Sequence, residues 1–307
     1  KKVSPGDRAN LLRRFSALVT SHREELAQLE ITNSGHTRGN ALWEADNVSN
    51  VLNYYAGAPE RLFGKQIPVA GGVDITFKEP IGVVGIIVPW NFPMPIASWG
   101  FAAALAAGNT VVLKPAELTP MTAVRLAELA LDAGIPEGVL NVIVGKGSVV
   151  GARFVSNPTV RKISFTGSTQ VGKQLASLAG LHMKRMTMEL GGHAPVIIFD
   201  DADVAIAAKT MVASKFRNAG QVCVSPTRFL VQEGIFKRFV DEFLQHTQQL
   251  QVGDGLHSDT KMGPLANPRR IAALEALTED VRQQHGKVHT GGHRIGDRGN
   301  FWAPTVV

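Results

Sequence analysis

The sequence contains a single cysteine, Cys223, whose side chain could act as a nucleophile. A thiolate attacks carbonyl carbons, although a free thiol is mostly protonated at neutral pH. Two further side chains could assist such an attack: Glu189 as a general base, and Asn91 as a hydrogen-bond donor to an oxyanion. Each also has a structural interpretation: a small buried thiol, a surface carboxylate, and a turn former before Pro93. These residue types suit acyl transfer without establishing it.

A second group of residues could hold a phosphate or a ribose. Gly167 and Gly172 stand at the start of a predicted helix, and a bare backbone at a helix N-terminus suits a pyrophosphate. The spacing differs from the usual dinucleotide fingerprint G-x-G-x-x-G, and a tight turn is an alternative explanation. Lys114 and Glu117 follow a predicted strand. They could hold ribose hydroxyls or form a solvated pair at a helix entry.

The elements that position these residues alternate between strands and helices. Strands are expected at Ile81–Val88, Thr110–Leu113, Val139–Val144, Lys162–Phe165 and Pro195–Phe199, and helices at Ala97–Ala107, Pro120–Ala133 and Val171–Ala179. This alternation predicts a parallel sheet with crossover helices. Ligands on such sheets bind at the carboxyl ends of the strands, so the residues that follow each strand are the candidates.

The remaining segments give a coarser prediction. The expected elements are one helix over Asp7–Leu29, a β-hairpin over Gly64–Pro80, a helix from Asp200 to about Asn218, a strand after Cys223 within Val222–Val231, and helices at Phe236–Leu250 and Arg270–Gln284. A change of domain is expected near Gly191–His193.

Composition excludes several classes of protein. The chain has 307 residues, 44% hydrophobic and 19% charged, which suits about two globular domains. The net charge is +6, but the basic residues are scattered, so a nucleic-acid partner is not expected. One cysteine rules out an intrachain disulfide and a multi-cysteine metal site. The longest apolar runs, Ile81–Val88 and Trp99–Ala107, are far shorter than the roughly 20 residues of a membrane helix. We expect a soluble, cytoplasmic protein without a secretory signal.

Taken together, the motifs resemble those of the aldehyde dehydrogenase superfamily. They are Pro-Trp-Asn-Phe-Pro (89–93), Lys-Pro-Ala-Glu (114–117), Phe-Thr-Gly-Ser (165–168), Glu-Leu-Gly-Gly (189–192) and Phe-Arg-Asn-Ala-Gly-Gln-Val-Cys (216–223). The resemblance implies an α/β fold with a doubly wound, Rossmann-like parallel sheet in an NAD-binding domain (1–63 and 81–192). It also implies a β-hairpin oligomerisation arm (64–80) and a second α/β, catalytic domain (193–307).

The resemblance also implies a role for each residue. Cys223 is expected to be the nucleophile and Glu189 the general base, with Asn91 and the backbone N–H of Cys223 forming the oxyanion hole. The residues expected to line the cofactor site are Ile87, Pro89, Trp90, Asn91, Lys114, Glu117, Gly147, Gly167, Ser168 and Leu190. The expected cofactor is NAD in preference to NADP, and no metal is needed.

For the substrate, the motif around Cys223 is most similar to succinate-semialdehyde dehydrogenases. Arg217 matches a position where those enzymes grip the substrate carboxylate, or it is a structural ion-pair partner. Trp99 departs from them, because a second arginine is common there and tryptophan is typical of relatives that take apolar aldehydes. Ser225 replaces a second cysteine. The alternatives are a CoA-acylating member, against which Glu189 argues, and a non-catalytic homologue.

The resemblance further implies a longer protein. Members of the superfamily begin earlier than Lys1 and continue beyond Val307 through a Glu-x-Phe-Gly-Pro motif whose glutamate holds the nicotinamide ribose. We therefore expect the 307-residue chain to be an inactive fragment truncated at both ends. In its full-length form we expect a homodimer or homotetramer that acts on a small-molecule aldehyde, with no nucleic acid or membrane as partner.

Overall fold

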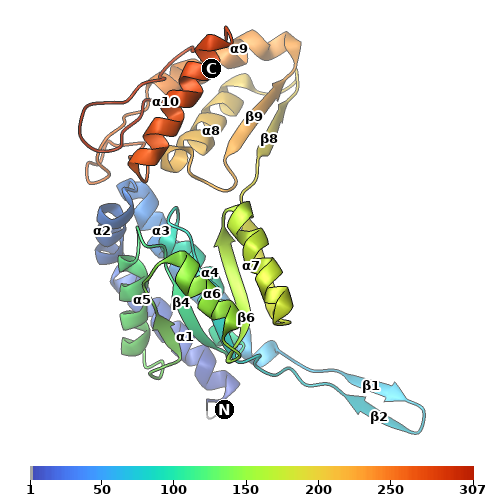
Figure 1. The fold of residues 1–307 in the computed structure, drawn as a ribbon. Coiled ribbons are helices and arrows are strands. Elements are labelled where there is room, and N and C mark those ends of the chain that lie inside the picture. Colours follow the sequence, from blue (N-terminus) through green and yellow to red (C-terminus); the bar gives the residue numbers. More distant parts are fainter. Residues whose placement is uncertain (1–2) are drawn as a thin grey trace. The chain divides into compact units, whose positions relative to one another are not determined.

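A computed structural model describes residues 3–307, which divide into two compact units (Figure 1). The first unit comprises the residues up to Asn33 together with Leu42–Leu190. The second comprises Ser34–Ala41 and Gly191–Val307. Among the described residues, no helix combines the length and the apolar character that crossing a membrane requires.

The first unit is built on a five-stranded parallel sheet with the order β5-β4-β3-β6-β7. Its strands are β3 (Val83–Ile87), β4 (Thr110–Lys114), β5 (Leu140–Val142), β6 (Val160–Gly167) and β7 (Arg185–Leu190). The predicted parallel sheet is confirmed. However, β7 was not anticipated, because its polar and apolar residues alternate and do not form a continuous apolar run like the one at Ile81–Val88.

Helices cover both faces of this sheet, as a doubly wound fold requires. They are α4 (Pro93–Ala106), α5 (Met121–Asp132), α6 (Gly147–Ser156) and α7 (Thr169–Leu181). Successive residues of a strand point to opposite faces. Accordingly Ile87 packs with Phe154 of α6 and Leu175 of α7, whereas Ile86 contacts Gly100 of α4. Phe15 stacks on Phe101 on the α4 side, with ring centroids 5.8 Å apart.

The N-terminal helices differ from the prediction. Instead of one helix over Asp7–Leu29 there are two, α1 (Pro5–Ser21) and α2 (Arg23–Ser34). His22 separates them: its backbone leaves helical geometry and its ring Nδ1 lies 2.9 Å from the Leu18 carbonyl oxygen. A third helix, α3 (Arg38–Ala56), was missed because polar residues dilute its apolar periodicity.

The predicted hairpin is confirmed as two antiparallel strands, β1 (Gln66–Val69) and β2 (Gly72–Ile75). The turn contains Gly71 at φ 77°, a left-handed conformation that favours glycine. Every residue of both strands is exposed. Within the described residues the two strands pair only with each other, and a two-stranded hairpin is at best marginally stable alone in water.

In the second unit, β8 (Ala194–Ile198) pairs in parallel with β9 (Pro226–Val231). The expectation that Pro195–Phe199 extends the main sheet is therefore wrong. An apolar run predicts a strand but does not predict which strand it pairs with. The main sheet ends at Leu190, before β8 begins. The helices of this unit are α8 (Val204–Phe216), the short 3-10 helix η2 (Arg217–Gly220), α9 (Glu233–Gln248) and α10 (Pro268–Gln283).

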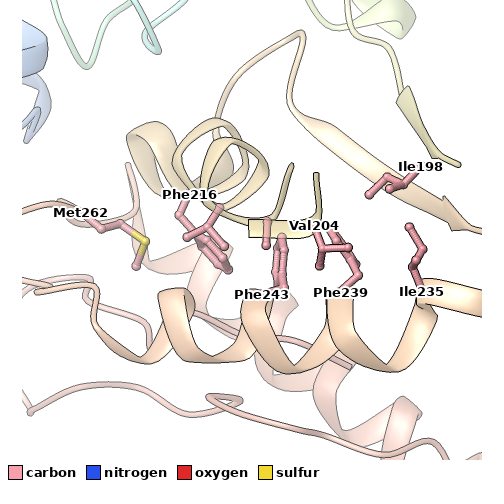
Figure 2. Packing of buried hydrophobic residues seen from close by; sticks show 9 residues of the cluster. Ile198, Val204, Phe216, Ile235, Phe239, Phe243 and Met262 are labelled. Carbon is pink, nitrogen blue, oxygen red and sulfur yellow. The ribbon is translucent and has the colours of Figure 1, made fainter. Parts of the chain in front are cut away.

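An aromatic cluster forms the core of the second unit. Figure 2 shows Phe216 of α8 meeting Phe239 and Phe243 of α9, with Met262 at one end and Ile198 at the other. The rings of Phe239 and Phe243 are 5.6 Å apart, centroid to centroid. Their periodic spacing on α9 made this helix predictable, and the cluster anchors the segment that leads to Cys223.

Candidate active site

The strands of the first unit bring most predicted cofactor residues to one edge. Ile87 is in register with Lys114, Thr166 with Glu189, and Gly167 with Leu190. Because parallel strands present their carboxyl ends at the same edge, these residues end β3, β4, β6 and β7 side by side. Three more predicted residues follow β3 in the loop that leads to α4: Pro89, Trp90 and Asn91.

A polar cradle lies at this edge. Lys114 is 4% exposed, and its Nζ is 4.0 Å from Oε1 of the half-exposed Glu117. Glu117 Oε1 also accepts a hydrogen bond of 2.8 Å from the backbone N–H of Gly147, the first residue of α6. Burial lowers the pKa of Lys114, and the Glu117 carboxylate acts in the opposite direction. The pair offers a donor and an acceptor, as ribose hydroxyls require.

Gly147 borders this cradle and leaves it open. A Cβ on Gly147 would lie 3.7 Å from Lys114 Nζ and 3.9 Å from Glu117 Oε1, so a side chain there would fill the cradle. The residues present therefore fit a nucleotide ribose at this position.

The glycines of the second candidate motif have a packing role. A Cβ on Gly167 would lie 2.6 Å from the Phe165 ring, and one on Gly172 would lie 2.5 Å from Leu190 Cδ2. Gly172 therefore allows α7 to approach β7 closely, whereas Gly167 leaves room for the Phe165 ring of its own strand. Ser168 is the N-cap of α7, where its hydroxyl accepts a hydrogen bond of 3.4 Å from a backbone N–H. Helix α7 begins at the same edge of the sheet as the cradle. The N-terminus of a helix favours the binding of an anion.

The predicted nucleophile lies in the second unit, after a strained backbone segment. Asn218, Ala219 and Gly220 have φ values of 49°, 54° and 75°. Left-handed conformation costs non-glycine residues energy and persists only where neighbouring contacts enforce it. Cys223 follows in a turn and is partly exposed.

Gln221 enforces this conformation, a role that the sequence did not reveal. Its Nε2 donates to the Asn218 carbonyl oxygen (3.0 Å), and its Oε1 accepts from the Ala266 backbone N–H (3.0 Å). The Gln221 side chain thus links the cysteine turn to the loop that contains Ala266, 45 positions later in the sequence.

A half-buried lysine near the cysteine turn was also missed. Lys215 Nζ lies 3.5 Å from the hydroxyl oxygen of Ser225, which is buried two residues after Cys223. Burial lowers the pKa of Lys215, and the nearby charge of Arg270 lowers it further. A lysine in a helix ordinarily indicates a solvated face, so no local pattern predicts this contact.

The two predicted substrate residues lie in different units. Trp99 is on α4 in the first, where its indole N–H donates to Asn47 Oδ1 over 3.0 Å. Arg217 begins η2 in the second and lines a cavity of about 410 Å³ together with Asn40 and Lys261. Cys223 likewise belongs to the second unit, whereas Asn91 and Glu189 belong to the first. The catalytic roles of these residues stay predictions.

Comparison with known proteins gives consistent results. The chain is 42% identical to a mitochondrial succinate-semialdehyde dehydrogenase of Arabidopsis thaliana, over 100% of this chain and 58% of that protein. It is 41% identical to a succinate-semialdehyde dehydrogenase [NADP(+)] of Escherichia coli, over 100% of this chain and 64% of that protein. The chain thus spans about three fifths of the length of these curated relatives.

Solved structures show the same similarity. A succinate-semialdehyde dehydrogenase from Burkholderia pseudomallei matches with a TM-score of 0.97 and 38% identity, covering 99% of this chain and 64% of that one. An NAD-dependent aldehyde dehydrogenase from Sinorhizobium meliloti matches with a TM-score of 0.96 and 37% identity, covering 99% and 61%. The model of the aldehyde dehydrogenase family matches residues 1–307. The chain belongs to the aldehyde dehydrogenase family.

Proposed function

We propose that the protein oxidises an aldehyde to a carboxylic acid with a nicotinamide dinucleotide, through a thioester on Cys223. The observation that carries this proposal is the cradle of Lys114, Glu117 and Gly147 at the carboxyl edge of a doubly wound sheet. Family membership and the presence of Cys223, Glu189 and Asn91 support it.

The residues of the carboxyl edge would hold the cofactor. Lys114 and Glu117 suit the adenosine ribose, and Ser168 at the start of α7 suits the pyrophosphate. The turn after β3, with Pro89 and Trp90, borders the same edge. When bound, the dinucleotide supplies the acceptor for two electrons and the hydrogen of the aldehyde carbon, which no protein side chain can accept.

The chemistry of the chain's own residues then follows. The Cys223 thiolate adds to the aldehyde carbon, and the tetrahedral oxyanion receives hydrogen bonds from the Asn91 amide and the Cys223 backbone N–H. Oxidation leaves a thioester on Cys223. Glu189 removes a proton from water, which attacks the thioester carbon. The C–S bond breaks, the acid leaves, and the thiol is restored.

A semialdehyde with a distal carboxylate is the proposed substrate class. Arg217 supports this, because a guanidinium binds carboxylates through charge-assisted hydrogen bonds. The names of the Arabidopsis and Escherichia coli relatives point to the same class.

The mechanism is tested in the natural gene product, with any residues that flank these 307. Cys223→Ala should abolish NADH formation. Glu189→Gln should give one rapid turnover of NADH and then stall, because the thioester is not hydrolysed. Glu137→Gln, the same change at an exposed site, is the control. Steady turnover near the native rate in either active-site variant would refute the mechanism, and acyl-CoA as product would favour the CoA-acylating alternative.

The hairpin of β1 and β2 is proposed to associate subunits into a homodimer or homotetramer. Its exposed apolar side chains, which include Val73 and Ile75, favour burial against another copy. Val73→Lys should therefore lower the mass measured by sedimentation of the natural gene product. Leu131→Lys places the same charge at an exposed site of α5 and should leave the mass unchanged. Equal masses for both variants would contradict the proposal that the hairpin of β1 and β2 associates subunits.

A further inference from the structure

The turn that carries Cys223 is closed by a backbone hydrogen bond. The Ser225 N–H donates to the Val222 carbonyl oxygen over 3.0 Å, so Cys223 and Val224 form the tip of this turn. Val224 is 68% exposed, whereas Ser225 is 4% exposed. Ser225 is therefore the inner end of the turn, and a group that holds its side chain also restricts the position of Cys223.

The side chain that contacts Ser225 comes from α8. Lys215 lies in the last turn of this helix, and its Nζ donates to the Ser225 hydroxyl oxygen, 3.5 Å away. The backbone of Lys215 also lies against the strained segment, because a Cβ on Gly220 would be 3.4 Å from the Lys215 carbonyl oxygen. One residue of α8 thus adjoins the chain both before and after Cys223.

The surroundings of Lys215 are unusual for a helical lysine, which ordinarily extends its ammonium into water. Lys215 is half-buried, and both its burial and the charge of Arg270 lower its pKa. Among the residues that the structure describes, it makes no ion pair with a carboxylate. A partly desolvated charge without an opposite charge costs free energy. A lysine that served only solubility would explain neither this burial nor the contact with Ser225.

We infer that Lys215 is a positioning residue for the nucleophile, which fixes the turn that presents Cys223 through the hydroxyl of Ser225. The inference rests on the proposed function, in which Cys223 attacks the aldehyde. A displacement of about 1 Å in a reacting group is enough to slow a reaction considerably. Loss of the contact should therefore slow the chemistry at Cys223 and leave the cofactor cradle, which belongs to the first unit, unchanged.

A double-mutant cycle in the natural gene product tests this inference. The substrate is propanal, because the loss of a protein charge does not alter the attraction of an uncharged aldehyde. Lys215→Met removes the ammonium at similar side-chain length, and Ser225→Ala removes its acceptor. Each should lower kcat/KM for propanal by about threefold to tenfold, the effect of one hydrogen bond. The double variant should be no slower than the slower single variant, because both residues act through one contact.

Two further measurements separate positioning from a general loss of structure. The Kd for NAD, measured by protein fluorescence, should be native in every variant, so the loss is confined to the reaction of the aldehyde. Lys215→Arg keeps a cationic donor and should retain the native kcat/KM. Lys209→Met makes the same change as Lys215→Met at an exposed position of α8 and is the control.

Failure of the inference and failure of the proposed function give different results. A native kcat/KM in Lys215→Met, or losses that multiply in the double variant, would overturn the positioning role while leaving aldehyde oxidation intact. A native protein that forms no NADH from propanal or any other aldehyde would overturn the proposed function and this inference with it. Losses in both single variants that do not grow in the double variant, with native values in Lys209→Met, support the inference.

Discussion

We propose that the Glu117 carboxylate determines which dinucleotide the cradle accepts. It is held by the Gly147 N–H (2.8 Å) with Lys114 Nζ at 4.0 Å, so its position is constrained. A carboxylate accepts hydrogen bonds from both ribose hydroxyls and repels a 2′-phosphate. We therefore predict a preference for NAD over NADP. Glu117→Gln should raise the ratio of kcat/KM for NADP to that for NAD by about tenfold, since it removes the repulsion.

Relatives of both kinds exist, an NAD-dependent one from Sinorhizobium meliloti and an NADP(+) enzyme from Escherichia coli, so the comparison does not decide the preference. The buried charge of Lys114 would favour a phosphate, in opposition to Glu117. Initial rates of NADH and NADPH formation in the native protein separate the two effects. An NADP advantage there would mean that Lys114 dominates.

At the residue scale, the sequence offered candidates for the chemistry but not the contacts around them. Cys223, Glu189 and Asn91 could be proposed because their motifs are local, and their catalytic roles stay predictions. The Trp99–Asn47 hydrogen bond joins residues 52 positions apart, and the bond from Ala266 to Gln221 spans 45. No local pattern encodes such pairs, because they depend on how the elements pack.

Elements were predictable where one periodic signal dominated. The strand β3 was found because a continuous apolar run is typical of a strand buried on both faces, and the helix α9 because burial follows its helical repeat. The helix α3 was missed because asparagine and serine interrupt its apolar positions, and β7 because its exposed residues are polar. The partner of β8 was assigned wrongly, since strand pairing is a property of the whole chain.

An ion pair between two helices predicts a dependence of stability on pH. Glu25 of α2 binds Arg125 of α5 at 2.6 Å, and this hydrogen bond lowers the pKa of Glu25 below its ordinary value of 4.5. A carboxyl whose pKa is lowered on folding adds stability above its unfolded pKa and loses it as pH falls through the folded pKa. Both side chains are partly exposed, so we expect about 1 kcal/mol or less at neutral pH.

The check is urea unfolding of Glu25→Gln beside the native chain. At pH 7 the variant should be less stable, and the difference should shrink as the pH falls below 4.5 and through the lowered folded pKa of Glu25, because the carboxyl then binds a proton in both states. Glu137→Gln, which alters an exposed carboxylate, should show no such difference. A gap between native and Glu25→Gln that persists unchanged in acid would mean that packing, and not charge, is responsible.

For the molecule as a whole, the two faces of the small β8–β9 sheet differ in burial. Ile197 and Leu230 are partners in register, and they are 60% and 58% exposed. The adjacent Ile198 is 4% exposed and belongs to the aromatic core of the second unit (Figure 2). The 307-residue chain by itself therefore presents a paired apolar face to water, which is an aggregation liability.

Neighbouring positions of β8 should consequently respond in opposite ways to the same change. In the 307-residue chain, Ile197→Thr should reduce dye binding and light scattering while leaving the helical circular dichroism unchanged, because threonine suits an exposed strand. Ile198→Thr places a hydroxyl and a smaller side chain in the core, and should lower the free energy of unfolding by about 1–3 kcal/mol. Both variants carry the same substitution on the same strand, so the effect of β-propensity cancels. What remains is the difference between the two faces of the sheet. If Ile197→Thr destabilises the chain as much as Ile198→Thr does, or leaves its scattering unchanged, the Ile197 face is not an exposed apolar surface of the isolated chain.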